Sequence, residues 1–225
     1  MNSKKTLLSW SSGKDSAWAL YKLLNMPEFE VVGLFTSINK KYGRVSMHGV
    51  SLEVLEMQAK ALNLPLSCLD LPDPCSNREY EEVMSSFLKS CRSQGVECFA
   101  FGDLFLEDIR TYRERQLGGS GISPVFPLWG MPTKKLAHEM LDSGVEACIT
   151  CVDSRSLSPS FSGRKWDGSL IKSFSESVDP CGENGEFHTL VTNGPMFDFP
   201  IEVEPGESVE REGFFFTDMK LKTSL

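Results

Sequence analysis

The sequence predicts an α/β protein with a Rossmann-like parallel sheet covered by helices, followed by a smaller α+β domain. In the first half of the chain, short apolar runs alternate with segments of helical periodicity. Because strands separated by helices make right-handed crossovers, this alternation favours a parallel sheet with helices on both faces. Beyond residue 153 the chain is rich in Ser, Gly and Pro, which indicates a change of domain. We predict domains over residues 1–125 and 126–225.

Four strands and four helices are expected in the first domain. Residues 30–36 (EVVGLFT) are rich in β-branched and aromatic side chains, and further strands are expected at 6–9, 65–69 and 98–101. The first helix, at 15–24, places Ala17, Leu20 and Leu24 at helical spacing. Ser51 is expected to cap a second helix, Asn77 to cap a third that ends near residue 91, and a fourth spans 104–116.

Glycines and prolines interrupt this pattern after the fourth helix. Gly118, Gly119 and Gly121 are followed by prolines at 124, 127 and 132, which predicts a structured connection. A helix at 133–143 and a strand at 145–152 then begin the second domain. That strand contains Cys148 and Cys151, whose spacing is weak support for a metal or redox site without a second pair.

Composition restricts the classes of function. The 225 residues carry a formal charge of −8, which disfavours a nucleic-acid partner, since those proteins need a basic surface. No apolar run approaches the ~20 residues that span a bilayer, and no membrane role is expected. The first residues lack the apolar core of a signal peptide, and the seven scattered cysteines do not form a disulfide framework. These features predict a cytoplasmic protein with reduced thiols.

A Ser/Gly turn between the first strand and first helix is the strongest functional signal. Its residues are Ser11, Ser12, Gly13, Lys14, Asp15 and Ser16. A helix N-terminus has unpaired N–H groups and partial positive charge, so this turn suits phosphate. The hydroxyls can donate further hydrogen bonds, Lys14 is a lesser phosphate ligand, and Asp15 can hold Mg²⁺. The P-loop pattern is excluded because Asp15 follows Lys14 where that motif needs Ser or Thr.

A second candidate site is the acidic, Gly-containing segment at residues 178–189. Glu183 and Glu186 lie three residues apart beside Cys181, His188 and Thr189. Paired carboxylates can accept protons, bind ammonium or hold a metal ion. Bare acidic turns are common, so this segment alone leaves function and an ordinary surface turn equally open.

The turn at 11–16 resembles the S-G-G-x-D-S signature of the PP-loop ATP pyrophosphatases, a branch of the adenine nucleotide α-hydrolase (HUP-type) fold. Together with the acidic segment, the chain resembles the diphthine–ammonia ligase family, whose C-terminal signature is close to E-G-G-E-[FY]-E-T. The resemblance covers nearly the whole chain and includes Gly102 and Asp103 and the segments at 127–130 (PLWG) and 161–164 (FSGR). Ser12, Asn184 and His188 depart from the family patterns.

This resemblance implies an enzyme that uses ATP to adenylate a carboxylate, which ammonia then converts to an amide, with AMP and pyrophosphate released. Its cofactors would be ATP and Mg²⁺, and its partners ammonia and a carboxylate acceptor on a small molecule or protein, with a homodimer as the assembly considered. The implied roles divide the residues into three groups. Catalytic residues would be Asp15, Glu183, Glu186 and His188; nucleotide ligands Ser11, Ser12, Gly13, Lys14, Ser16, His48, Gly102 and Asp103; substrate ligands Asn184 and Thr189.

Two other functions remain open at this stage. A PP-loop enzyme that thiolates tRNA would explain the cysteines, although it predicts a basic surface. A nucleotide-binding module without turnover is the other alternative. A basic helix segment carrying Arg110, Arg113 and Arg115 could neutralise phosphate, but nearby glutamates favour a solvent-exposed, salt-bridged helix.

Overall fold

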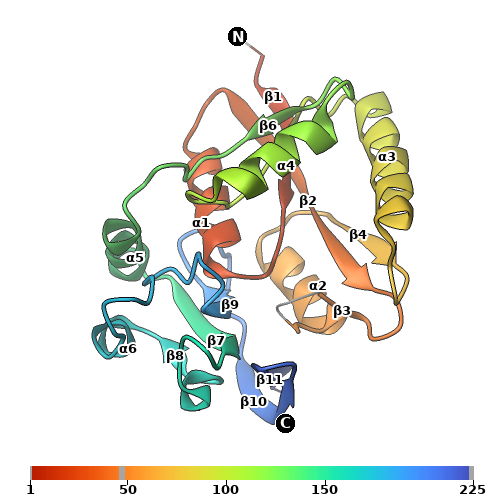
Figure 1. Cartoon of the computed structure of the whole chain (residues 1–225). Helices are drawn as coiled ribbons and strands as arrows, with labels where there is room; N and C mark the ends of the chain where they lie inside the picture. The colour runs from red at the N-terminus through yellow and green to blue at the C-terminus, as the bar shows by residue number, and fades with distance from the viewer. Residues whose placement is uncertain (1, 46–48, 223–225) are drawn as a thin grey trace.

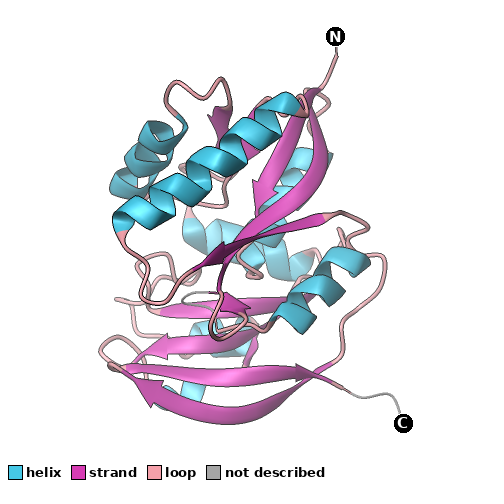
Figure 2. Cartoon of the chain, turned by 90° about the vertical axis from the view of Figure 1, so that its right-hand side faces the viewer, coloured by secondary structure: helices cyan, strands magenta, loops and turns pink. Residues whose placement is uncertain are grey.

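A computed structural model describes residues 2–45 and 49–222, and these form two sheets with the helices around them (Figures 1 and 2). The first sheet is mixed but mostly parallel. Its strand order is β3-β2-β1-β5-β6, and β4 also pairs with β2. Its strands are β1 (Lys4–Ser9), β2 (Phe29–Asn39), β3 (Arg44–Val45), β4 (Leu66–Leu71), β5 (Cys98–Ala100) and β6 (Ser123–Val125). The predicted α/β class with a largely parallel sheet is confirmed.

Helices cover both faces of this sheet. Since neighbouring residues of a strand point to opposite sides, each strand packs against helices on both faces. They are α1 (Lys14–Leu24), α2 (Leu52–Ala61), α3 (Asn77–Ser93) and α4 (Glu107–Leu117). Leu8 packs in the cluster with α1 and α2, whereas Leu7 packs with α3 and with Leu117 at the end of α4.

The structure confirms one of the predicted helix caps and corrects another. Ser51 caps α2 by accepting from the Val54 N–H, as expected. The cap of α3 is Ser76, not Asn77, because Ser76 forms a reciprocal capping box with Glu79.

The second sheet is antiparallel and contains most of what the sequence did not reveal. After α5 (Thr133–Asp142), its order is β10-β11-β7-β8, with β9 also pairing with β7. Its strands are β7 (Glu146–Asp153), β8 (Lys165–Trp166), β9 (Phe187–Asn193), β10 (Val203–Arg211) and β11 (Phe214–Leu221). A 3₁₀ turn (Pro159–Phe161) and the short helix α6 (Gly168–Lys172) complete this part.

One apolar cluster joins the two sheets. Leu8 and Leu20 of the first unit belong to the same buried cluster as Ile149, Trp166 and Leu190 of the second. The last strand of the first sheet ends at Val125, and α5 begins at Thr133. The predicted boundary at 125/126 falls in this connection, but the core is continuous across it. None of the helices in residues 2–45 and 49–222 combines the length and apolar composition that a bilayer crossing requires.

Candidate active site

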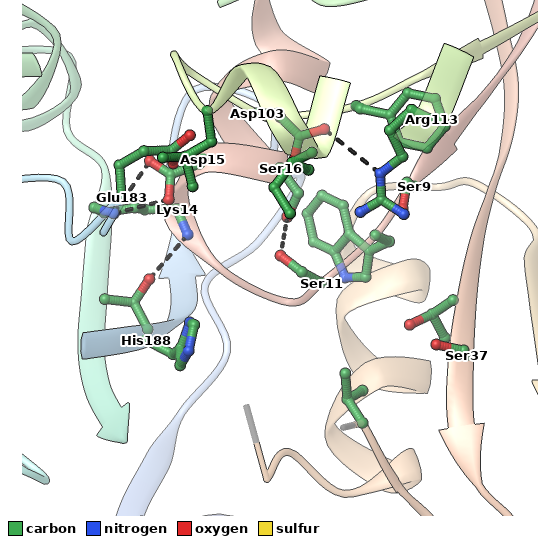
Figure 3. A pocket seen from close by; sticks show the side chains of 18 of the residues that line it. Ser9, Ser11, Lys14, Asp15, Ser16, Ser37, Asp103, Arg113, Glu183 and His188 are labelled. Atoms are coloured by element: carbon green, nitrogen blue, oxygen red, sulfur yellow. Dashed lines mark hydrogen bonds and ion pairs between the residues drawn. The ribbon is translucent and has the colours of Figure 1, made fainter. Parts of the chain in front are cut away.

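A cavity of about 460 Å³ lies where the carboxyl ends of β1, β2 and β5 face the loop before β9. This edge is where parallel α/β sheets bind ligands, because helix N-termini and loops converge there. Figure 3 shows the Ser/Gly turn in the middle of the cavity, with Glu183 and His188 at one end and Arg113 at the other. The two sequence segments singled out as candidate sites therefore meet in one cavity.

The Ser/Gly turn has the geometry of an anion site. Gly13 is the N-cap of α1 and has no side chain that could accept from the first amides of the helix, and Ser11, Asp15 and Ser16 around this helix start line the cavity. The Ser11 and Ser16 hydroxyls lie 3.2 Å apart, and Ser16 Oγ donates to the Gly13 carbonyl at 2.9 Å.

Ser12 adopts a backbone conformation that favours glycine. Its φ is +73°, and it occupies the position at which the PP-loop signature has glycine. Its side chain is buried, and Oγ has no hydrogen-bond partner among the described residues. The expected role of the Ser12 hydroxyl as a phosphate ligand does not fit this burial, whereas its backbone shapes the turn.

Gln58 of α2 holds the Ser/Gly turn in place through buried hydrogen bonds. The sequence analysis did not single out this residue. Its side-chain amide donates to the carbonyls of Ser12 (3.1 Å) and Val191 (2.7 Å) and accepts from Trp10 Nε1 (2.9 Å). Val191 N–H also donates to the Ser12 carbonyl at 2.9 Å. The one available signal was its place on the buried face of α2, next to Val54 and Leu55.

Lys14 is directed into the interface between the two sheets. Its ammonium lies 2.8 Å from Asp15 Oδ2, donates to the Cys181 carbonyl, and lies 5.4 Å from the ring centroids of Trp166 and Phe187. Burial opposes its charged form, but Asp15, Cys181 and Glu183 together outweigh that cost and raise the pKa of Lys14 above its usual value. With its side chain 1% exposed, Lys14 joins Asp15 to the acidic loop at the wall of the cavity, and its role as a phosphate ligand stays a prediction.

Glu183 bridges the two halves of the chain within the cavity. Its Oε1 accepts from the N–H groups of Leu104 (2.7 Å) and Phe105 (3.3 Å), just after β5. Burial, together with the negative charges of Asp15 and Asp103, raises the pKa of Glu183 to about 7, although the backbone donors oppose the shift. A carboxyl group with this pKa exchanges its proton near neutrality.

Glu186 and Asn184 have a different place from the one expected. Glu186 is buried, and its carboxylate accepts from Asp179 N–H, Asn184 N–H and Asn184 Nδ2 at 2.9–3.0 Å. Neither residue lines the cavity, and Asn184 is exposed. Both therefore shape the loop that carries Glu183, so the expected catalytic and substrate-binding contacts are not supported by this geometry.

His188 and Thr189 are the second and third residues of β9 and line the cavity. Burial, with a smaller effect of the Lys14 charge, lowers the pKa of His188 to about 4, so its imidazole is neutral at pH 7. Thr189 Oγ1 accepts from the Lys14 N–H at 3.2 Å, which places it at the first turn of α1. His48, expected to contact the nucleotide, lies outside the described residues.

Gly102 and Asp103 lie beside the turn, as the sequence predicted. A Cβ on Gly102 would stand 3.0 Å from backbone atoms of Asp15 and Ser16, so only glycine fits without a shift. Asp103 Oδ2 lies 3.6 Å from Arg113 Nε, and burial raises the pKa of Asp103 against the opposing effect of Arg113. Arg113 lines the cavity, so the interpretation of this helix as a solvent-exposed, salt-bridged surface does not hold for Arg113. It holds for Arg110, which forms the expected ion pair with Glu114.

Cys148, Cys151 and Cys181 show no reactive environment. Cys181 lines the cavity, but burial raises the pKa of its thiol, and Sγ lies 3.5 Å from the Thr133 carbonyl. Cys148 and Cys151 lie on β7, where burial likewise raises their pKa values, that of Cys151 to about 12. Thiolate, the nucleophilic form, is therefore disfavoured at these three positions.

Fold and cavity together define the class of protein: an α/β protein of the PP-loop type, with a second, antiparallel unit that contributes to the site. Comparison with known families makes this specific. The N-terminal domain of diphthamide synthase matches residues 4–124, and the C-terminal domain of diphthamide synthase matches residues 132–223. The chain belongs to the diphthamide synthase family.

Its relatives include proteins named diphthine–ammonia ligase. The protein from Schizosaccharomyces pombe is 24% identical over 232 residues, covering 94% of this chain and 38% of the relative. The protein from Rattus norvegicus is 26% identical over 140 residues, covering 60% of this chain and 52% of the relative. The protein from Homo sapiens is 26% identical over 227 residues, covering 88% of this chain and 82% of the relative. The chain thus spans 38% of the fission yeast protein and about half of the rat protein.

Proposed function

We propose that this protein is an ATP-dependent ligase that adenylates a carboxylate and lets ammonia displace AMP, forming an amide and releasing AMP and pyrophosphate. The observation that carries the proposal is the meeting of an anion-binding turn and the Glu183 carboxyl in one cavity. The family relationship supports the same chemistry, with diphthine or a related carboxylate as the acceptor. ATP and ammonia are then its small-molecule partners.

The turn suits the phosphates of ATP. Ser11, Gly13 and Ser16 offer hydroxyl and backbone donors at the positive end of α1, which stabilise phosphate charge in the ground state and the transition state. Asp15 stands in the first turn of the same helix, where it can face the phosphate chain. Gly102 permits this turn to pack directly against the end of β5.

Glu183 is the group best suited to remove a proton from the incoming nitrogen. An effective general base has a pKa near the working pH, and the pKa of Glu183 is about 7. His188, with a pKa of about 4, is a weak base at neutral pH and acts by orienting the acceptor through its neutral imidazole. Glu186 and Asn184 act as positioning residues that hold the Glu183 loop.

The residues present also fit Mg²⁺ in the form in which nucleotides carry it. Mg²⁺ at phosphate sites is held by one or two carboxylates, with phosphate oxygens and water completing its shell. Asp15 supplies such a carboxylate in the first turn of α1, and within the described residues no group of three or more metal-ligating side chains is found. When bound, Mg²⁺ would offset phosphate charge as the bond between the α- and β-phosphates breaks.

The product of ATP cleavage tests this proposal. Protein is incubated with ATP, Mg²⁺, ammonium and a pool of cellular carboxylates and proteins, and the nucleotides are separated by chromatography. We expect AMP and pyrophosphate from the wild type, almost none from Asp15→Ala, and wild-type levels from Asp70→Ala, whose side chain is exposed on β4.

Two outcomes would contradict the proposal. ADP and phosphate as products would exclude cleavage between the α- and β-phosphates. ATP binding without turnover under every acceptor mixture would favour the nucleotide-binding module. The thiolating alternative predicts that Cys181→Ser abolishes activity, whereas the raised pKa of this buried thiol leads us to expect activity to survive.

A further inference from the structure

We propose that Asp103 and Arg113 form a clamp on the ribose hydroxyls of the nucleotide, so that the site selects ribonucleotides over deoxyribonucleotides. This inference rests on the proposed binding of ATP. It assigns to Arg113 a role that neither the turn nor the acidic loop can perform. It also gives Asp103 a specific partner within the ligand.

The pair is arranged to receive a ligand. Asp103 Oδ2 and Arg113 Nε are buried and form an ion pair at 3.6 Å, but neither atom has a hydrogen-bond partner among the described residues. Both residues line the cavity. In Figure 3 the terminal guanidinium nitrogens of Arg113 point away from Asp103. Buried polar atoms are costly without partners, so an arrangement of this kind indicates that a bound molecule completes it.

The pair also lies at the right distance from the phosphate turn. Asp103 follows Gly102, whose backbone packs against Asp15 and Ser16 so closely that a Cβ would stand 3.0 Å from them. In a nucleotide, the ribose is joined to the α-phosphate through one ester oxygen and one carbon. A phosphate at Ser16 therefore brings the sugar next to Asp103.

The walls beyond the pair favour the base. Arg113 Cζ lies 4.9 Å from the ring centroid of Phe101. Phe101 belongs to one apolar cluster with four other residues that line the cavity, Phe35, Leu69, Tyr80 and Met84. A purine ring is hydrophobic on its faces, so it partitions to this end, while Glu183 and His188 occupy the polar end. The ribose then lies between base and turn, at Asp103 and Arg113.

The chemistry of the two side chains matches a diol. A carboxylate accepts two hydroxyl protons, as acidic residues do for ribose in dinucleotide-binding folds, and a guanidinium donates to the hydroxyl oxygens. A site built to bind a hydroxyl group rejects an analogue that lacks it, because its buried polar atoms are then left unpaired.

The test compares the dissociation constants of ATP, 2′-deoxy-ATP and 3′-deoxy-ATP by titration calorimetry with Mg²⁺ present. Because hydrogen bonds to charged groups are strong, we expect the wild type to bind ATP about 10- to 100-fold more tightly than at least one deoxy analogue. Asp103→Ala should bring this ratio close to one, and Asp103→Asn and Arg113→Gln should lower it. Arg110→Gln is the matched control on the same helix and should keep the wild-type ratio, since Arg110 pairs with Glu114.

Several results would overturn the clamp. Equal affinities of the wild type for all three nucleotides would refute it while leaving ATP cleavage to AMP intact. Equal weakening of ATP and both analogues in Arg113→Gln would assign Arg113 to the phosphates instead. Absence of ATP binding to the folded wild type would refute the clamp and the proposed function together. Thermal melting of each variant separates a changed ratio from failure to fold.

Discussion

Replacing Gln58 by leucine should destabilise the protein and loosen the phosphate turn at once. The substitution keeps a side chain of similar size on α2 but removes three buried hydrogen bonds, to Ser12, Val191 and Trp10. The Ser12 carbonyl keeps its bond from Val191 N–H, whereas Trp10 Nε1 and the Val191 carbonyl lose a partner. The turn therefore keeps one of its two supports.

The magnitude follows from these bonds. Each buried hydrogen bond contributes about 1 kcal/mol, and an orphaned buried polar group costs about 1–3 kcal/mol. The apolar surface of leucine offsets part of the loss. We expect the free energy of unfolding to fall by about 2–4 kcal/mol, which lowers the melting temperature by roughly 4–16 °C in a chain of this size.

Urea denaturation followed by tryptophan fluorescence measures this change, and ATP titration measures its effect on the turn. Gln94→Leu is the control, because Gln94 is exposed at the end of α3 and should change stability by less than about 0.5 kcal/mol. A Gln58→Leu protein with unchanged stability would show that this amide does not support the turn. Unchanged ATP affinity despite lower stability would separate the turn from its support.

Three further substitutions test other parts of the site. Ser12→Gly should raise the free energy of unfolding, measured in urea titrations, by about 1–2 kcal/mol. The reason is that glycine adopts the left-handed backbone conformation without strain and removes a buried hydroxyl that has no hydrogen-bond partner among the described residues. A loss of stability would contradict this expectation. Gly102→Ala should cost about 1–3 kcal/mol and weaken ATP binding in calorimetry, since the new Cβ displaces the start of α1; normal affinity would mean that the neighbouring backbone yields freely. The pKa of Glu183 is raised to about 7 from 4.5, so the folded state holds a proton that the unfolded state has lost, and wild-type stability should fall as pH rises through that window. Glu183→Gln should lack this fall in denaturation curves at pH 4.5 and 7, and parallel curves for the two proteins would refute the shift.

The parts of the fold with strong local signals were predictable. The alternation of apolar runs and helical periodicity gave β1, β2, β4 and β5 with the helices between them. The turn at 11–16 and the acidic loop could be singled out because Gly, Ser and acidic residues cluster there. These signals are local, so one sequence contains them.

What sequence reasoning missed depends on contacts between distant segments. Strand β10 is exposed almost throughout and has no apolar alternation, so only its pairing with β11 defines it. Gln58 and Arg113 look like ordinary polar helix residues until tertiary packing brings the first to Ser12 and the second to Asp103. Glu186 resembles a catalytic carboxylate until its bonds within its own loop are seen.

The contact between β9 and the turn limits how this protein can change over evolutionary time. The Val191 N–H donates to the Ser12 carbonyl, and Thr189 Oγ1 accepts from the Lys14 N–H, so the second unit supplies part of the frame that shapes the proposed ATP site. The halves cannot be recombined between distant relatives as independent modules, because a foreign second unit would bring a mismatched strand against the turn. Substitutions on β9 and around residue 12 should accumulate in compensating pairs, and new segments should be acquired where β9 and the turn remain undisturbed.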